Sequence, residues 1–396
     1  MRRLIVAVAL VAACRGDREP APSAGSAAVS VVPYLPQSPD GAEELRAIDQ
    51  RVAIHRDEPL VEIALLLDRA SLRGHVEDYV EALARSAELV EHAPDERDAW
   101  ALRTRALAAV HDFAAAREAL AKVKALDPHG LAYPELATSI DEAAGDRTRA
   151  LVMRDAAAKS TPNPATLTMF AASLTLAGRY DDAIALIPRA AKLVHDNSPE
   201  LFSWLLFQWG RIYEQKGDFA AARQLYAASV ARLPGYLEAT THLAQTMLAT
   251  GDTPAATKLV REALAADRHP ALLELGAQLQ LATREDAKAE WDRYVQALPK
   301  AFADHAARFY LGVGADPQVA LRLAQQNLAN REVAEARELV VLAALAANDP
   351  ATACTAAGPL VNAPVRAHRF AAWRALARCG RQHDADRLAK DLGITP

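Results

Sequence analysis

The sequence has 396 residues, of which 51% are hydrophobic and 6% are aromatic, and its formal net charge is −5. The apolar fraction excludes a chain that is disordered throughout, and the acidic balance argues against general nucleic-acid binding. Because the apolar residues are mostly Ala, Leu and Val, we expect closely packed helices, arranged as roughly two or three domains or as one extended array.

The chain begins with a predicted targeting segment. Met1-Arg2-Arg3 is basic, and the run LIVAVALVAA at residues 4–13 is apolar and ends at Cys14. A helix of this length reaches about 15 Å, half of a hydrocarbon core, so residues 1–13 are predicted to be a signal peptide rather than a membrane span. Val11-Ala12-Ala13-Cys14 resembles the bacterial lipobox, which implies cleavage before Cys14 and its lipidation. A secretory signal with a chance cysteine is the alternative.

Residues 14–39 are predicted to be the lipidated cysteine followed by a tether. The segment is rich in Pro, Ser and Ala and has no helical period, which favours an extended or flexible chain. Arg15, rather than Asp, follows the cysteine, and the lipoprotein resemblance then implies an outer membrane location facing the periplasm.

From about residue 63 onward the sequence repeats. Pro94, Pro128 and Pro162 are equally spaced along the chain. In the same register an alanine recurs, at Ala82, Ala116, Ala150, Ala183, Ala222, Ala256, Ala289, Ala320, Ala353 and Ala385. An acidic residue stands four positions earlier in eight units, as Asp78, Asp112, Asp146, Asp218, Asp252, Glu285, Asp316 and Asp349. Each unit is predicted to contain two helices, with these acids capping the second helix.

The clearest unit resembles a known repeat. It reads Trp209-Gly210-x-x-Tyr213, then Gly217-Asp218-Phe219-x-x-Ala222-x-x-x-Tyr226 and Pro234. This pattern resembles the tetratricopeptide repeat. The resemblance implies an all-α fold, a right-handed superhelical solenoid of about ten helix pairs over residues 63–396. Residues 40–62, which open with a predicted capping box from Asp40 to Glu43, are expected to cap the array.

Three features interrupt the repeat. Pro188 and Pro359 fall inside predicted second helices, so a kink or an early helix end is expected at both. The step from Ala183 to Ala222 is the longest between successive alanines of the register, which predicts a long connection near residues 195–199 with Ser198-Pro199 starting the next helix.

The repeat register also places two cysteines. Cys354 lies near the start of a second helix, and Cys379 lies at the end of the first helix of the next unit. These helices are antiparallel neighbours in a repeat stack, and an exported protein meets an oxidising compartment, so we expect a disulfide between Cys354 and Cys379. Two separately buried thiols are the alternative.

The tetratricopeptide resemblance also implies a partner-binding groove lined by the first helices. Its groove positions correspond here to Trp204, Phe207, Arg211, Glu214, Glu238, Thr241, Gln245 and Arg105. Exposed aromatics beside an arginine are typical of a binding hot spot, although Trp204 and Phe207 are alternatively expected to pack under the long connection before them. A weaker patch is formed by Phe370, Arg374 and Arg378.

No motif predicts catalysis. Zinc, nucleotide and nucleophile-elbow patterns are absent from the sequence, so no enzyme activity and no cofactor are expected. The sequence therefore predicts a lipid-anchored periplasmic scaffold or adaptor that binds a peptide or protein of the cell envelope. The alternatives are a cell-wall glycan-binding protein or envelope enzyme using the same groove, and a purely structural spacer.

Overall fold

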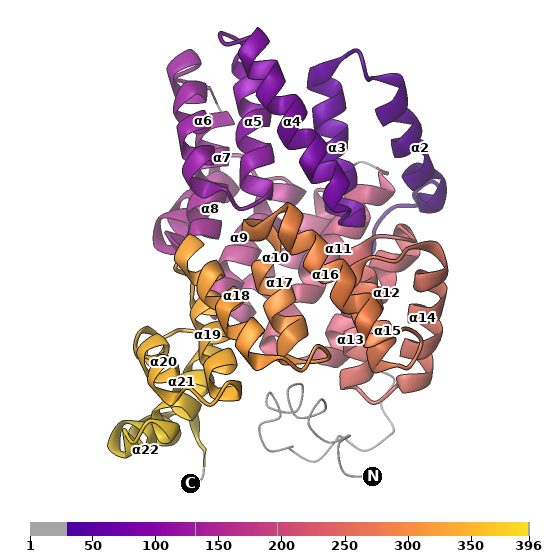
Figure 1. The fold of residues 1–396 in the computed structure, drawn as a ribbon. Helices are drawn as coiled ribbons and strands as arrows, with labels where there is room; N and C mark the ends of the chain where they lie inside the picture. Colours follow the sequence, from indigo (N-terminus) through magenta and orange to yellow (C-terminus); the bar gives the residue numbers. More distant parts are fainter. Residues whose placement is uncertain (1–29, 131, 196, 395–396) are drawn as a thin grey trace.

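The structure, a computed structural model, describes residues 30–130, 132–195 and 197–394. In these ranges it contains 21 α-helices and one short 3-10 helix, and no strand. The expected signal peptide at residues 1–13 and the expected lipid attachment site Cys14 lie outside the described residues. Figure 1 shows the helices stacked in chain order.

After α2 (Gly41–Ile54), the helices form ten consecutive pairs in the described chain. The first helices of the pairs are α3 (Pro59–Arg73), α5 (Arg97–Ala109), α7 (Ala132–Ala144), α9 (Pro164–Leu176), α11 (Pro199–Lys216), α13 (Leu237–Ala249), α15 (Pro270–Gln278), α17 (Pro299–Leu311), α19 (Ala334–Ala346) and α21 (Arg366–Arg378). The second helices are α4 (Val76–His92), α6 (Phe113–Leu126), α8 (Arg147–Ser160), α10 (Tyr180–Lys192), α12 (Phe219–Arg232), α14 (Thr253–Ala266), α16 (Arg284–Ala297), α18 (Pro317–Asn330), α20 (Pro350–Ala357) and α22 (Gln382–Leu392).

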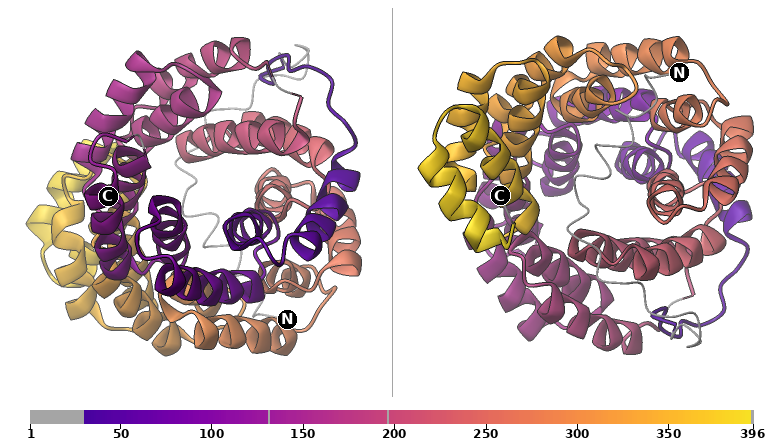
Figure 2. Two further views of the ribbon diagram at one scale, coloured as in Figure 1. Left: turned by 90° about the horizontal axis from the view of Figure 1, so that it is seen from above. Right: turned by 90° about the horizontal axis from the view of Figure 1, so that it is seen from below.

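The pairs wind into a right-handed superhelix, which Figure 2 shows as a ring when it is viewed along its axis. The predicted all-α solenoid of about ten helix pairs is confirmed. Its first pair begins at Pro59 rather than at residue 63, because α3 extends one turn further toward the N-terminus than the repeat register requires.

Aspartate caps start most of the second helices, as the acidic register predicts. In α6, α8, α12, α14, α18 and α20 the N-cap is Asp, and its carboxylate accepts from the backbone N–H three residues later at 3.0–3.4 Å. Asp78 instead lies inside the first turn of α4 and pairs with Arg69. Glu285 does not cap α16, because Thr283 does.

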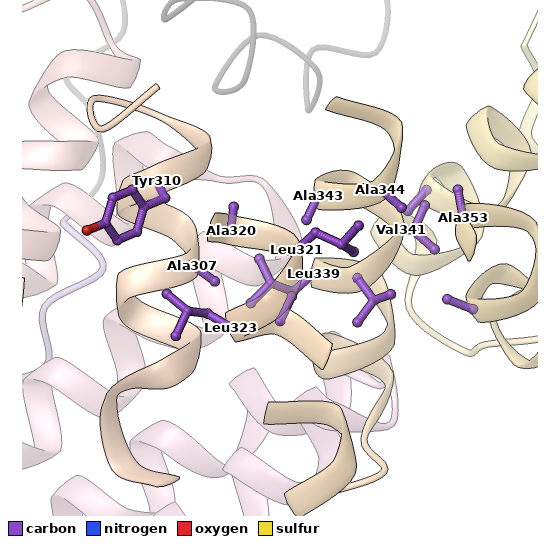
Figure 3. Close-up of a cluster of buried hydrophobic side chains, with 14 of the residues drawn as sticks. Ala307, Tyr310, Ala320, Leu321, Leu323, Leu339, Val341, Ala343, Ala344 and Ala353 are labelled. Atoms are coloured by element: carbon purple, nitrogen blue, oxygen red, sulfur yellow. The ribbon is translucent and has the colours of Figure 1, made fainter. Parts of the chain in front are cut away.

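Recurring alanines mark the places where helices cross. Nine of the ten predicted alanines have no exposed surface, and Figure 3 shows Ala320 and Ala353 in the core between α17 and α20. In the seventh unit the buried alanine is Ala287, whereas the predicted Ala289 is exposed. The register there is shifted by two residues because α15 is a short first helix that ends at Gln278.

The two interrupting prolines behave differently. The helix α20 ends at Ala357, and Pro359 lies in a 3-10 turn, so the expected early end is present there. By contrast, α10 continues through Pro188 to Lys192. An early end is therefore wrong for Pro188.

The start of α11 follows the predicted long connection. Ser198 is its N-cap, and the Ser198 hydroxyl oxygen accepts from the N–H of Leu201.

Residues 30–39 are held against the solenoid and are not a free tether in this part. Leu35 is buried with residues of α9 to α12, and the Arg232 guanidinium donates to the carbonyl oxygen of Pro36 at 2.7 Å and to the Ser38 hydroxyl at 3.0 Å. The backbone N–H of Val31 donates to the Gln224 side chain. The apolar residues Val31, Val32 and Leu35 explain the docking, because they bury surface that a polar tether would leave in water.

Near the C-terminus, a covalent bond joins neighbouring pairs. The sulfur atoms of Cys354 in α20 and Cys379, the C-cap of α21, are bonded, and the two Cα atoms are 6.1 Å apart. This separation lies within the range of about 4.4–6.8 Å that a disulfide allows.

Successive turns of the superhelix are in direct contact. His75 Nε2 lies 2.9 Å from Asp267 Oδ2, and Arg147 Nη2 lies 2.6 Å from Glu335 Oε2. The residues of these two pairs are 192 and 188 positions apart, so one superhelical turn takes about 190 residues. We call this contact the inter-turn seam; it joins residues 74–79, 111–112, 145–147 and 178 of the first turn to residues 237, 267–269, 293–302, 330–335 and 364 of the second.

Charged groups concentrate at one end of this seam. Glu335 binds Arg147 and lies 3.6 Å from His368 Nε2, and His368 Nδ1 lies 3.0 Å from Glu338 Oε2. Burial alone would lower the pKa of His368, but its hydrogen bonds to the two carboxylates raise that pKa to about 9. His368 is therefore positively charged at neutral pH, and the cluster holds two cations against two carboxylates.

A turn glycine allows the close approach at the seam. Gly74 has φ of 72°, and a Cβ atom there would lie 2.5 Å from Leu237 Cδ2 and 2.8 Å from His269 Nε2. Gly251 occupies the equivalent position between the two helices of a later pair, α13 and α14, with φ of 84°. A Cβ atom there would meet nothing within 4 Å. At both positions any other residue would strain the backbone, but the two positions differ in what surrounds them.

This difference predicts the effect of two matched substitutions. Gly74→Ala should lower the free energy of unfolding by about 1–3 kcal/mol more than Gly251→Ala, because only the former overpacks the seam. Urea denaturation followed by circular dichroism measures the difference, and small-angle X-ray scattering should show a larger radius of gyration for Gly74→Ala alone. Equal effects of the two substitutions would show that the turns are not in close contact.

Candidate functional site

The first helices lie on the inner side of the superhelix. Consecutive first helices pack on one another, for example α3 on α5, α5 on α7 and α19 on α21, whereas consecutive second helices of the described chain do not pack closely. A curved stack brings its inner elements closer together than its outer ones. The groove positions expected from the repeat therefore belong to helices that face the centre of the ring seen in Figure 2.

Phe207 does not line an exposed groove. Its side chain is 1% exposed, and its ring lies 5.7 Å from the ring of Tyr226 and 5.4 Å from the rings of Tyr236 and His242. Residues of α2 and α3, including Leu45, complete this cluster from the preceding superhelical turn. The expectation of an exposed aromatic at position 207 is wrong, because helices from a distant, earlier part of the chain cover the site.

Trp204 is partly buried, one turn earlier on α11. It packs against the cluster that contains Val194, Phe202 and Leu205. Val194 directly precedes the long connection, so Trp204 fits the expectation of packing near that connection better than the expectation of an exposed hot spot. Trp209 is fully buried and donates its indole N–H to the Thr168 hydroxyl at 3.2 Å.

A hydrogen-bonded network surrounds Glu214 in the last turn of α11. Glu214 Oε2 accepts from the Tyr226 hydroxyl at 2.6 Å and lies 2.9 Å from His242 Nδ1, and Arg211 lies 3.9 Å away. Burial would raise the pKa of Glu214, but the hydrogen bond to His242 and the charges of His242 and Arg211 hold that pKa below its usual value. Glu214 is thus an ionised group that binds its own neighbours.

Only part of the predicted groove set on α13 is open to solvent. Glu238 and Gln245 are exposed, whereas Thr241 is 8% exposed and donates its hydroxyl hydrogen to the Glu238 carbonyl oxygen at 3.0 Å. Together with the half-buried Arg211, these two exposed residues form a polar surface on α11 and α13.

Arg105 lies apart from that surface, on α5, and borders a shallow pocket between α5 and α7. The guanidinium is exposed, with Asp68 at 3.4 Å. The pocket is lined by Arg105, Ala108, Ala109, Glu135, Leu136, Ser139 and Ile140. Glu135 and Ser139 were not among the predicted groove residues. They occupy the fifth and ninth positions of the unit that starts at residue 131, so the same groove positions applied to that unit would have found them.

Neither a metal site nor a membrane-spanning helix is found in the described ranges. No group of three or more His, Cys, Asp and Glu side chains there is arranged to hold a metal ion. None of the helices placed by the structure combines the length and the apolar character needed to cross a bilayer.

The burial of Phe207 predicts a structural rather than a binding phenotype. Phe207→Ala should lower the free energy of unfolding by about 3–5 kcal/mol, because it leaves a cavity among packed rings. The exposed Gln245→Ala should change it by about 0.5 kcal/mol or less. Chemical denaturation of both variants checks this expectation. If Phe207→Ala leaves the free energy of unfolding unchanged, the ring of Phe207 lies on an exposed surface and this expectation is wrong.

Comparisons with known proteins agree with the helical repeat. A tetratricopeptide repeat family model matches residues 214–279. No curated protein matches the sequence.

Three solved structures are similar to the chain at low sequence identity. The APC/C hetero-tetramer Cut9–Hcn1 has a TM-score of 0.48 and 14% identity, over 89% of this chain and 66% of that chain. Yeast Tom70 has a TM-score of 0.35 and 14% identity, over 89% of this chain and 99% of that chain. The P58(IPK) TPR domain has a TM-score of 0.25 and 16% identity, over 82% of this chain and 99% of that chain. Residues 214–279 are thus similar in sequence to the tetratricopeptide repeat, and they lie within a solenoid that is helical throughout the described residues.

Proposed function

We propose that the protein is a lipid-anchored scaffold on the periplasmic side of the outer membrane, and that its inner surface binds a peptide or protein of the cell envelope. A helical repeat scaffold of this type suggests protein–protein interaction. The envelope location rests on the basic and apolar N-terminus that ends at Cys14.

The observation that supports the binding site most directly is the pocket between α5 and α7. Arg105 and Glu135 supply opposite charges, Ser139 supplies a hydroxyl, and Leu136 and Ile140 supply an apolar floor. A peptide segment offers carbonyl oxygens, N–H groups and apolar side chains, so this combination suits it. The shallow shape suits an extended segment better than an enclosed small molecule.

The polar surface on α11 and α13 lies on the same inner side of the superhelix as the pocket. Arg211, Glu238 and Gln245 offer donors and acceptors there without a large exposed apolar area. Binding at such a surface draws its specificity from hydrogen bonds and charge, and an apolar anchor is more readily supplied at the pocket between α5 and α7.

This proposal predicts that charge reversal at the pocket disrupts partner capture. Arg105→Glu should reduce the amount of any protein crosslinked from envelopes by about tenfold, because it turns a cationic border into an anionic one beside Asp68 and Glu135. The matched control is Arg261→Glu, an exposed position on the second helix α14. Quantitative mass spectrometry compares the two variants with the wild type. Equal capture by Arg105→Glu and Arg261→Glu would rule out the pocket.

The anchor is tested separately. Labelled palmitate should be incorporated into the wild-type chain and should be absent from Cys14→Ser, because the thiol of Cys14 is the proposed attachment point. Label that persists in Cys14→Ser would reject the lipid anchor without bearing on the pocket.

A further inference from the structure

The helix α21 carries a concentration of positive charge that is not paired with acidic residues elsewhere in the described structure. Its thirteen residues contain Arg366, Arg369, Arg374 and Arg378 and no Asp or Glu. No other helix in the described chain contains four arginines. The whole chain has a net charge of −5, so this helix is an exception to the overall balance.

These arginines have no acidic partner within the described structure. None of the four makes an ion pair or a side-chain hydrogen bond there, and Arg369 Nε is buried without a hydrogen-bond partner. The nearest carboxylates of α19, Glu335 and Glu338, are bound by His368 on the opposite, buried face of α21. On α22, Asp384 is bound by arginines outside α21. The guanidinium groups of α21 therefore remain available.

The available residues form one row. Arg366, Phe370, Arg374 and Arg378 follow one another at intervals of four residues, so each lies about 40° further around α21 than the one before, and the row winds gradually along the exposed side of the helix. Arg366 and Arg378 are exposed, and Phe370 and Arg374 are partly exposed. The ring of Phe370 lies 5.2 Å from that of Trp373, which gives the row an aromatic centre. Because α21 packs on α19 as a first helix, the row belongs to the inner side of the stack.

We propose that this row binds an extended acidic segment of a partner protein, with the pattern acidic, any, apolar, any, acidic, any, acidic. Four residues of helix advance by about 6 Å, and two residues of an extended chain advance by about 6.6 Å. Alternate residues of an extended chain point to the same side. Acidic side chains at the first, fifth and seventh positions therefore meet Arg366, Arg374 and Arg378, and the apolar third residue meets Phe370.

The chemistry of the row favours a peptide over an anionic membrane surface. Both aromatic rings are partly buried and the row lies on the inner side of a curved stack, so a flat bilayer has poor access to it. Arginine also forms paired hydrogen bonds with carboxylates, which an extended peptide can present in register. The row is distinct from the pocket between α5 and α7, so a negative result for one proposal does not affect the other.

A designed peptide tests the proposal on the full-length chain. The probe is a fluorescein-labelled peptide that contains Glu-Ala-Phe-Ala-Glu-Ala-Glu, and fluorescence anisotropy gives its Kd. A peptide of the same composition, Ala-Glu-Phe-Glu-Ala-Glu-Ala, places its acidic residues on the side opposite the phenylalanine. We expect the first peptide to bind about tenfold more tightly than the second, and its affinity to fall as salt is raised.

Two variants locate the binding. Arg374→Gln should weaken binding of the first peptide about tenfold. Arg322→Gln should leave it unchanged; Arg322 is an exposed arginine on α18 that makes no ion pair with any residue the structure describes. Thermal melting of both variants should match that of the wild type, because neither arginine holds a partner in the fold. Equal binding of the two peptides, or an unchanged Kd in Arg374→Gln, would overturn the proposal. Binding to phosphatidylglycerol vesicles that is lost in Arg374→Gln, without peptide binding, would overturn it in favour of a membrane surface.

Discussion

The close contact between successive superhelical turns is the constraint on which the rest of this structure depends. A stack of helix pairs contacts mainly its neighbours in sequence, and small changes in the angle between pairs then accumulate along its length. Here residues from successive turns are bound to each other, as the Arg147–Glu335 pair shows. The seam therefore fixes the pitch of the superhelix and with it the spacing of the inner helices.

Contacts at the seam stabilise His111 in an unfavourable backbone conformation. It adopts φ of 58°, a backbone conformation that costs a residue other than glycine about 1–2 kcal/mol of conformational free energy. Its carbonyl oxygen accepts from Asn330 at 3.0 Å, and its Nδ1 lies 3.3 Å from the Lys300 carbonyl oxygen, both in the second superhelical turn. Its ring stacks on Phe113 at 5.5 Å. These contacts offset the strain and give a side chain a role at a turn where most other pairs have glycine.

Local features of the fold could be predicted from the sequence because each depends on a few adjacent residues. An Asp four residues before a small residue specifies a cap and a helix crossing within one unit, and this logic located the units around Ala116 and Ala222. It failed by two residues at Ala289, where the short α15 changes the local register. The regular spacing of the repeat carries no comparable information about which distant loops meet.

The burial of Phe207 is an example of a distant contact that the repeat spacing does not predict. Its repeat position is a groove position, and nothing adjacent to it in sequence predicts that α2 and α3 will complete a cluster over it. That contact requires the superhelix to close on itself after one turn, which depends on the sum of many small rotations between pairs. The same reasoning explains why the composition of residues 30–39 predicts only an extended or flexible tether, since the surface that holds Leu35 comes from α9 to α12.

The seam also bears on the binding that we propose for the inner surface. The turn before α6 is held to Lys300 through Asp112 at 2.8 Å, and the start of α8 is held to Glu335 through Arg147. The helices α5 and α7, which carry Arg105 and Glu135, are thereby fixed relative to each other before any partner arrives. A surface that is already ordered loses less conformational entropy on binding, so modest contacts in a shallow pocket give more affinity than they would in a flexible solenoid. If the proposed binding at this pocket is correct, loosening the seam should therefore weaken it, even though the seam residues do not line the pocket.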